Sequence, residues 1–127
     1  CTALASGFSP SQGTDLSGPT AVVKSTVRTD HTLLGNGMVL DLKFAPDFFS
    51  NAEKASAFRH LVEAYFKMGG MEIQFNVIDR ETLLAARESP AEYQDLIVRV
   101  SGFSAYFVDI SAETQDEIIA RTEHVGV

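Results

Sequence analysis

The alternation between two hydrophobic periodicities in residues 38–77 constrains the fold of this chain most strongly. In residues 38–44 and 71–77 apolar side chains occupy every second position, which predicts two strands. The intervening segment carries apolar residues at helical spacing, namely Phe58, Leu61, Val62, Tyr65 and Phe66. A strand, a helix and a second strand in this order indicate parallel strands joined by a crossover helix.

Capping signals bound the central helix. Ser50 followed three residues later by Glu53 is a capping box, and Gly69-Gly70 allows the left-handed conformation that ends many helices. We expect the strand at residues 71–77 to have one apolar face, because its other positions are Glu72, Gln74 and Asn76.

The rest of the chain continues the α/β order. Helices are predicted at about residues 21–28 and after Ser111, each with a capping residue or a proline at its start, and also at about residues 80–87. Residues 96–100 form a nearly continuous apolar run, which is typical of a strand covered on both faces. The predicted fold class is α/β, with residues 1–18 as a loop segment and residues 19–127 as one domain.

Charge and composition exclude several function classes. The net charge of −7 repels phosphate backbones and anionic lipid, so neither nucleic acid nor a membrane surface is an expected partner. No apolar run approaches the roughly 20 residues that span a bilayer. The single cysteine cannot form an internal disulfide, which agrees with a cytoplasmic location.

That cysteine is Cys1, and the sequence does not begin with methionine. We therefore expect the chain to be part of something longer. A lipoprotein tethered through residues 6–17 is the alternative interpretation.

The usual metal and nucleophile motifs are missing from the sequence. His31, His60 and His124 are scattered without metal-ligand spacing, and His60 falls outside the apolar series of its helix, which predicts an exposed side chain. Neither a phosphate-binding glycine loop nor a nucleophile elbow is present. We therefore predict no metal-binding and no cofactor-binding residues.

Residues 99–107 read Arg-Val-Ser-Gly-Phe-Ser-Ala-Tyr-Phe, and Gly102 interrupts two apolar arms. By pattern alone the arms form a hairpin-like loop and Gly102 is its turn glycine. The run, however, closely resembles the R-V-[SA]-G-[YF] motif of glycyl radical enzymes. Five further blocks resemble the C-terminal region of that family in the same order: residues 17–22 with 24–25, 69–77, 81–83, 90–96 and 115–122.

The resemblance implies a function for Gly102. In the family, a radical-SAM activating enzyme that uses a 4Fe-4S cluster and S-adenosylmethionine removes one α-hydrogen from the motif glycine. The glycyl radical then generates a thiyl radical on a cysteine, which abstracts hydrogen from a small organic substrate. The loop is buried in an α/β barrel and is oxygen-sensitive, so the resemblance predicts an anaerobic lyase or dehydratase whose C-terminal barrel region is this chain.

The sequence also departs from a complete enzyme. The family's thiyl cysteine lies far upstream of this region, and Cys1 does not match it. Expected partners are therefore an upstream catalytic portion, the activating enzyme and a second copy of the full enzyme. A stand-alone spare-part subunit and a non-catalytic acidic α/β binding domain are the alternatives.

Residues 103–109 look more like the dehydratase, C–N or C–S lyase, arylacetate decarboxylase and fumarate-adding branches than like pyruvate formate-lyase. Among these branches, we favour the diol-dehydratase-like group as the subfamily of this chain. The substrate itself cannot be assigned from these residues.

Overall fold

The computed structural model describes residues 7–126, and its centre is a three-stranded parallel sheet. Strand β1 (Val39–Phe44) lies between β2 (Glu72–Val77) and β5 (Glu123–His124). The predicted parallel pairing of the first two strands is confirmed, since β1 and β2 run in register from Val39↔Glu72 to Phe44↔Val77. Strand β5 has only two residues and no periodicity, so the sequence did not predict it.

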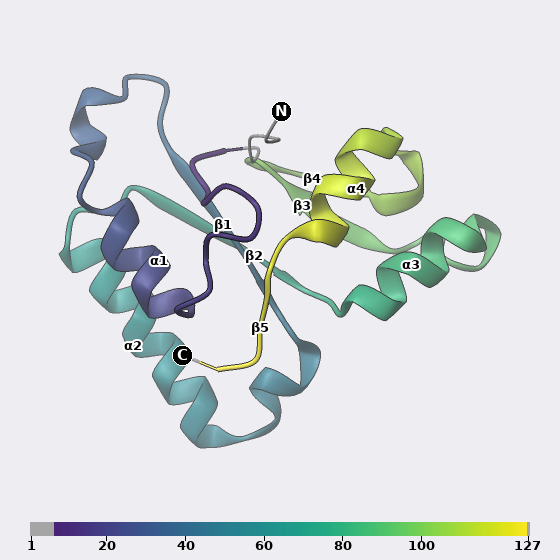
Figure 1. The fold of residues 1–127 in the computed structure, drawn as a ribbon, viewed down its shortest axis with the longest axis horizontal. Helices are drawn as coiled ribbons and strands as arrows, with labels where there is room; N and C mark the ends of the chain where they lie inside the picture. The colour runs from purple at the N-terminus through teal and green to yellow at the C-terminus, as the bar shows by residue number, and fades with distance from the viewer. Residues whose placement is uncertain (1–6, 127) are drawn as a thin grey trace.

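Helices α1 (Pro19–Thr26) and α2 (Ala52–Lys67) lie together on one side of the sheet (Figure 1). They cover Leu40, Leu42 and Phe44, which form the first hydrophobic cluster with residues of both helices. Phe44 is at its centre, with ring centroids 4.8 Å from Phe48 and 5.5 Å from Phe58. Such tilted and edge-to-face contacts add to the stabilisation from burial alone.

A second layer lies on the opposite side of the sheet (Figure 1). It consists of α3 (Arg80–Glu88), α4 (Ala112–Ala120) and the hairpin of β3 (Ile97–Val100) and β4 (Phe103–Tyr106). The second hydrophobic cluster, which includes Leu83, Val98, Phe107 and Ile118, holds these elements together. Short 3₁₀ turns at His31–Leu33, Pro46–Ser50, Pro90–Glu92 and Phe107–Asp109 complete the chain. Within the described residues, no helix is both long and apolar enough to cross a membrane.

The start of α2 differs from the capping-box prediction. Asn51, and not Ser50, is the N-cap, and its side-chain oxygen accepts the Lys54 N–H at 2.8 Å. The reason is local, because Ser50 is the last residue of the preceding 3₁₀ turn and the helix begins only at Ala52.

The two hairpin arms also differ in part from their predictions. The antiparallel hairpin is confirmed, with pairing from Ile97↔Tyr106 to Val100↔Phe103. The first arm is not covered on both faces in this chain, since Ile97 is 59 % exposed. The second arm ends at Tyr106, where the chain turns into a 3₁₀ segment that buries Phe107.

Strands β1 and β2 are buried on their polar side as well. Ile73 and Phe75 pack against the first cluster as the alternation predicts, yet the most buried positions of β2 are Gln74 and Asn76. In β1 the buried polar residues are Asp41 and Lys43. Asp41 pairs with Gln74 and Lys43 with Asn76 across the two strands. These four residues, called the polar face below, are directed toward the second layer.

The glycine that follows α2 tests how tightly the first cluster is packed. A Cβ on Gly70 would collide with the ring of the fully buried Tyr65. We expect Gly70→Ala to lower the free energy of unfolding by about 1–3 kcal/mol, the usual cost of overpacking a core. Urea denaturation measures this change.

Gly35→Ala is the matched control, because its Cβ would meet nothing within 4 Å and its φ is not positive. Its stability should be unchanged or higher by up to about 1 kcal/mol. Equal destabilisation by both substitutions would contradict the packing argument.

Candidate functional site

Ser101 and Gly102 form the two-residue turn between β3 and β4. Their φ angles are 37° and 99°, and positive φ at both central residues is the signature of a type I′ hairpin turn. Glycine adopts this conformation without strain, whereas Ser101 does so at some cost. Gly102 is exposed in this chain, and a Cβ placed on it would meet no atom within 4 Å.

The polar face of the sheet holds this hairpin through side chains. The Gly102 N–H donates to Gln74 Oε1 at 3.0 Å. Two residues along β2, Asn76 accepts the Arg99 N–H at 2.8 Å and donates to the Arg99 carbonyl at 2.9 Å. No backbone ladder joins β2 to β3 in the described residues, so two side-chain amides make the polar connection.

Gln74 is in turn held by Asp41, the neighbouring residue on β1. Gln74 Nε2 donates to Asp41 Oδ1, and Arg121 Nη1 lies 3.6 Å from Asp41 Oδ2. Arg121 also pairs with Glu117 on α4 at 2.5 Å. Burial raises the pKa of the Asp41 carboxyl to about 6, although the positive charge of Arg121 opposes this shift.

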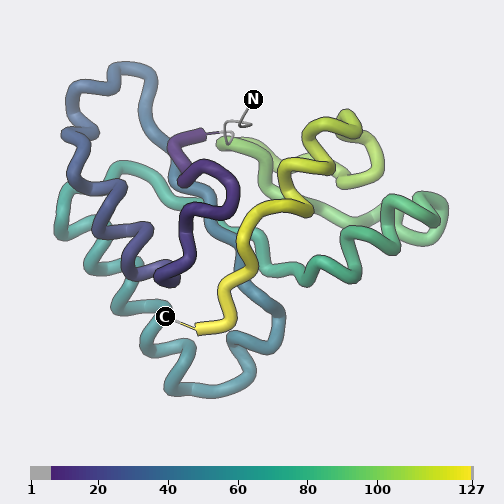
Figure 2. The backbone as a smooth tube through the Cα atoms, in the orientation of Figure 1, coloured from purple at the N-terminus to yellow at the C-terminus, as the bar shows by residue number. Residues whose placement is uncertain are grey.

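The segment at residues 7–9 lies beside the hairpin turn (Figure 2). A Cβ on Gly7 would be 2.9 Å from Asp41 Oδ2 and 3.0 Å from Ser101 Oγ, so only glycine allows this approach. The Phe8 N–H donates to the Val39 carbonyl, and the Asp41 N–H donates to Ser9 Oγ at 3.1 Å. Through these contacts the segment lies along the start of β1, next to the hairpin turn.

The other end of the polar face binds α4. Lys43 is fully buried and donates to the carbonyls of Ile119 at 3.3 Å and Ile118 at 3.5 Å. These oxygens lie in the last turn of α4, where a positive charge is favourable. Burial lowers the pKa of Lys43, since removal from water disfavours the ammonium form.

The three histidines lie apart and have different environments. His60 is exposed, as predicted. His31 is buried, and its Nδ1 accepts the Met71 N–H at 3.1 Å, so its Nε2 carries the proton and donates to the Thr26 carbonyl at 3.2 Å. His124 on β5 is also buried, which lowers its pKa, and its Nε2 lies 3.9 Å from Asp15. Cys1 lies outside the described residues.

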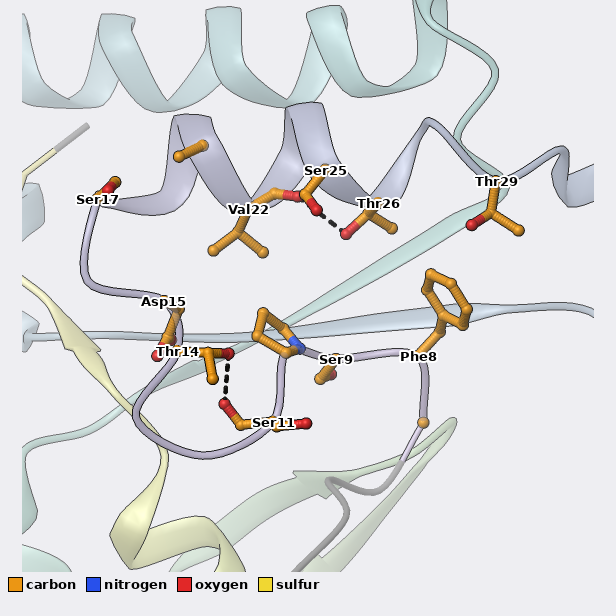
Figure 3. A pocket seen from close by; sticks show the side chains of 13 residues that line it. Phe8, Ser9, Ser11, Thr14, Asp15, Ser17, Val22, Ser25, Thr26 and Thr29 are labelled. Atoms are coloured by element: carbon orange, nitrogen blue, oxygen red, sulfur yellow. Dashed lines mark hydrogen bonds between the residues drawn. The ribbon is translucent and has the colours of Figure 1, made fainter. Parts of the chain in front are cut away.

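A cavity of about 640 Å³ separates the segment at residues 7–17 from α1 (Figure 3). Its lining is rich in hydroxyl groups, including Ser9, Ser11, Thr14, Ser25 and Thr29. Several of these groups already have partners within the chain, such as Thr14 Oγ1, which donates to the Ser11 carbonyl at 2.7 Å. One end of the cavity reaches Gly7, where an added Cβ would lie 3.0 Å from Ser101 Oγ of the hairpin turn.

Comparison with known proteins assigns the chain to a family. Residues 4–108, a range that includes Gly102, match the family described as Glycine radical. The chain belongs to this family. It is 47 % identical over 120 residues to the trans-4-hydroxy-L-proline dehydratase of Clostridioides difficile and 42 % identical over 117 residues to the indoleacetate decarboxylase of Tractidigestivibacter scatoligenes. These matches cover 94 % and 92 % of this chain.

The fold agrees with a solved member of the family. The B12-independent glycerol dehydratase of Clostridium butyricum superposes on 95 % of this chain with a TM-score of 0.91 and 46 % identity. The mixed α/β architecture with a parallel sheet therefore corresponds to the C-terminal region of a glycyl radical enzyme. The chain spans only 15 % of that structure, and 15 % and 13 % of the dehydratase and the decarboxylase.

Sequence reasoning found the turn glycine but not the residues that hold it. Gln74 and Asn76 were recognised only as polar positions of an alternating strand, and Asp41 only as a polar residue between leucines. These residues can be identified because they lie on the same face of two neighbouring strands. This arrangement is visible only once the register between the strands is known.

The raised pKa of Asp41 predicts a pH-dependent effect on stability. In the folded state this carboxyl has a pKa of about 6 against an ordinary value of 3.8, so the unfolded chain loses the proton first as the pH rises. The contribution of Asp41 to stability therefore falls between pH 4 and pH 6. In Asp41→Asn this fall is absent.

We expect the free energy of unfolding of Asp41→Asn, relative to that of the unaltered chain, to rise by on the order of 2–3 kcal/mol between pH 4 and pH 6 and then to level off. Urea denaturation at several pH values measures this difference. Carboxyl groups elsewhere titrate equally in both proteins, and a difference that is constant with pH would contradict the assignment.

Proposed function

We propose that Gly102 carries the radical of a glycyl radical enzyme whose domain is formed by residues 19–127, with residues 1–18 as the loop leading into it. The observation that carries the proposal is the family match across residues 4–108, in which Gly102 is the glycine of the Arg-Val-Ser-Gly-Phe run. The geometry supports it, because Gly102 lies at the tip of a hairpin with open space on one side of its Cα.

The chemistry requires glycine at this position. A radical-SAM activating enzyme takes one α-hydrogen atom, and the unpaired electron stays on a planar Cα flanked by an amide nitrogen and a carbonyl. A side chain would crowd this planar state and would leave no second α-hydrogen. In turnover, a hydrogen atom moves from a cysteine S–H to the Gly102 Cα, which leaves a thiyl radical, and it returns to sulfur after the substrate has reacted.

The thiol and the substrate site belong to an upstream catalytic portion in this proposal. Ile97 is 59 % exposed and Phe103 is 56 % exposed, and Tyr106 on the same hairpin is also exposed. Exposed apolar groups of this size along the hairpin, with Phe103 next to the turn and Ile97 and Tyr106 at its other end, favour a partner surface that covers them. An upstream barrel would bury the hairpin and exclude oxygen from the radical.

The reaction class is a dehydration, lyase or decarboxylation reaction of a small organic molecule in the cytoplasm of an anaerobic cell, catalysed by a homodimer. Relatives that are dehydratases, a sulfite-lyase and a decarboxylase support this range. The extent of the matches, over 92 % or more of this chain in these relatives, favours a portion of a large enzyme over a spare-part subunit.

The Gly102→Ala variant tests the radical site. Within this chain an added Cβ has open space, so we expect the substitution to lower the free energy of unfolding by only about 1–2 kcal/mol, from the positive φ. The full protein containing this chain is incubated anaerobically with an activating enzyme, and electron paramagnetic resonance measures the radical. We expect a glycyl doublet in the unaltered protein and none in Gly102→Ala.

Gly69→Ala provides a matched control. Gly69 has a φ of 96° against 99° for Gly102, and a Cβ there also meets nothing within 4 Å. The control therefore places an alanine at a nearly equal positive φ and should retain the doublet. Loss of the doublet in both variants, or its persistence in Gly102→Ala, would contradict the assignment.

Exposure of the activated protein to air gives a second, independent test. Oxygen should react at the radical carbon and cleave the chain there, which releases the segment that begins at about residue 103. Intact mass spectrometry detects both pieces. Cleavage should be absent in Gly102→Ala and in unaltered protein that was never activated, and an uncleaved activated protein would argue against a radical at Gly102.

A further inference from the structure

Among the residues that the structure describes, the backbone N–H of Gly102 donates a hydrogen bond to the side chain of Gln74. The amide nitrogen of Gly102 is one of the two groups that share the unpaired spin. A hydrogen bond at 3.0 Å from this nitrogen therefore acts directly on the radical residue.

We propose that Gln74 is a positioning residue for the radical, and that Asp41 determines which end of the Gln74 amide faces Gly102. The proposal rests on Gly102 being the radical site. Gln74 Oε1 fixes the plane of the peptide between Ser101 and Gly102 and favours spin delocalisation onto that nitrogen. The Asp41 carboxylate, an acceptor only, holds Gln74 Nε2 and so leaves Oε1 for Gly102.

An amide is needed at position 74 because its two neighbours have opposite requirements. The Gly102 N–H needs an acceptor, and the Asp41 carboxylate needs a donor. Gln74 is 6 % exposed and Asp41 is 2 % exposed, so water does not readily replace either contact. A carboxylate at position 74 would face Asp41 with like charge, and an aliphatic side chain would satisfy neither group.

Besides Gln74 on β2, two parts of the chain contact Asp41: the end of α4 contacts its carboxyl group, and the segment at residues 7–9 contacts its backbone. Arg121, at the end of α4, approaches Oδ2 at 3.6 Å, and its guanidinium also binds Glu117. Ser9 accepts the backbone N–H of Asp41. A continuous line of contacts thus runs from α4 through Asp41 and Gln74 to the Gly102 nitrogen.

Asn76 provides the comparison that distinguishes positioning of the radical residue from attachment of the hairpin. It lies two residues further along the same face of β2 and is equally buried, and its amide makes two hydrogen bonds to Arg99. It has no hydrogen bond to Gly102 among the described residues. A variant at Asn76 therefore weakens the attachment of the hairpin without removing the contact to the radical residue.

The test uses the full protein labelled with ¹⁵N-glycine and activated anaerobically. Electron paramagnetic resonance measures the radical yield and the ¹⁵N hyperfine coupling of Gly102. We expect Gln74→Leu to lower the yield by on the order of fivefold to tenfold, the effect of losing one hydrogen bond to a critical group, and to change the ¹⁵N coupling. Asn76→Leu should leave the ¹⁵N coupling of the radical that forms unchanged.

A pair of variants keeps the test decisive if Gln74→Leu fails to fold. Gln74→Glu alone places two carboxylates together and should lower the yield at a pH high enough to ionise both of them. When Gln74→Glu is combined with Asp41→Asn, the carboxylate at position 74 can accept from Gly102 while the amide at position 41 donates to that carboxylate. The double variant should therefore recover the yield and the ¹⁵N coupling of the unaltered protein.

Each outcome has a defined meaning. An unchanged ¹⁵N coupling in Gln74→Leu, an equal change in Asn76→Leu, or no recovery in the double variant would overturn the positioning role. Absence of a doublet in the unaltered protein would instead overturn the radical assignment of Gly102, so the two failures are distinguishable.

Discussion

The structure depends on four buried polar side chains that parallel strands rarely accommodate. Asp41, Lys43, Gln74 and Asn76 lie on one face of β1 and β2, where unpaired polar groups would cost free energy. Each one finds its partner in the second layer or on the neighbouring strand: Arg121, the end of α4, Gly102 and Arg99. The need to satisfy these groups therefore determines how the hairpin and α4 sit on the sheet.

The two faces of the sheet have different tasks. The apolar face, with Leu40, Leu42 and Phe44, supplies the burial that holds α1 and α2. The polar face determines the orientation of the hairpin, because hydrogen bonds fix distances and angles in a way that apolar contacts do not. The hairpin is accordingly oriented by a few specific contacts, while the second hydrophobic cluster supplies the burial beneath it.

Much of the fold was readable from the sequence because periodicity reports local structure. The helix at residues 52–67, the two parallel strands and the hairpin follow from spacing and from glycine positions. The cap at Asn51 was missed because a 3₁₀ turn displaced the helix start by one position. The burial of Gln74 and Asn76 could not be predicted, since alternation shows that a strand has two faces but not what covers the polar one. The proposal that Gly102 carries the radical came from the motif, because its turn geometry alone is what any type I′ glycine shows.

The side-chain attachment of the hairpin has a consequence for the geometry of the turn. A strand ladder ties every peptide of one strand rigidly to the next, whereas the amides of Gln74 and Asn76 reach the hairpin through rotatable torsions. In the proposed radical the Gly102 Cα changes from tetrahedral to trigonal, which rotates the adjacent peptide. A small rotation of the Gln74 side chain keeps its hydrogen bond to the Gly102 N–H in the plane of that peptide, so in this proposal the change in hybridisation is taken up by side chains and not by the parallel strands beneath.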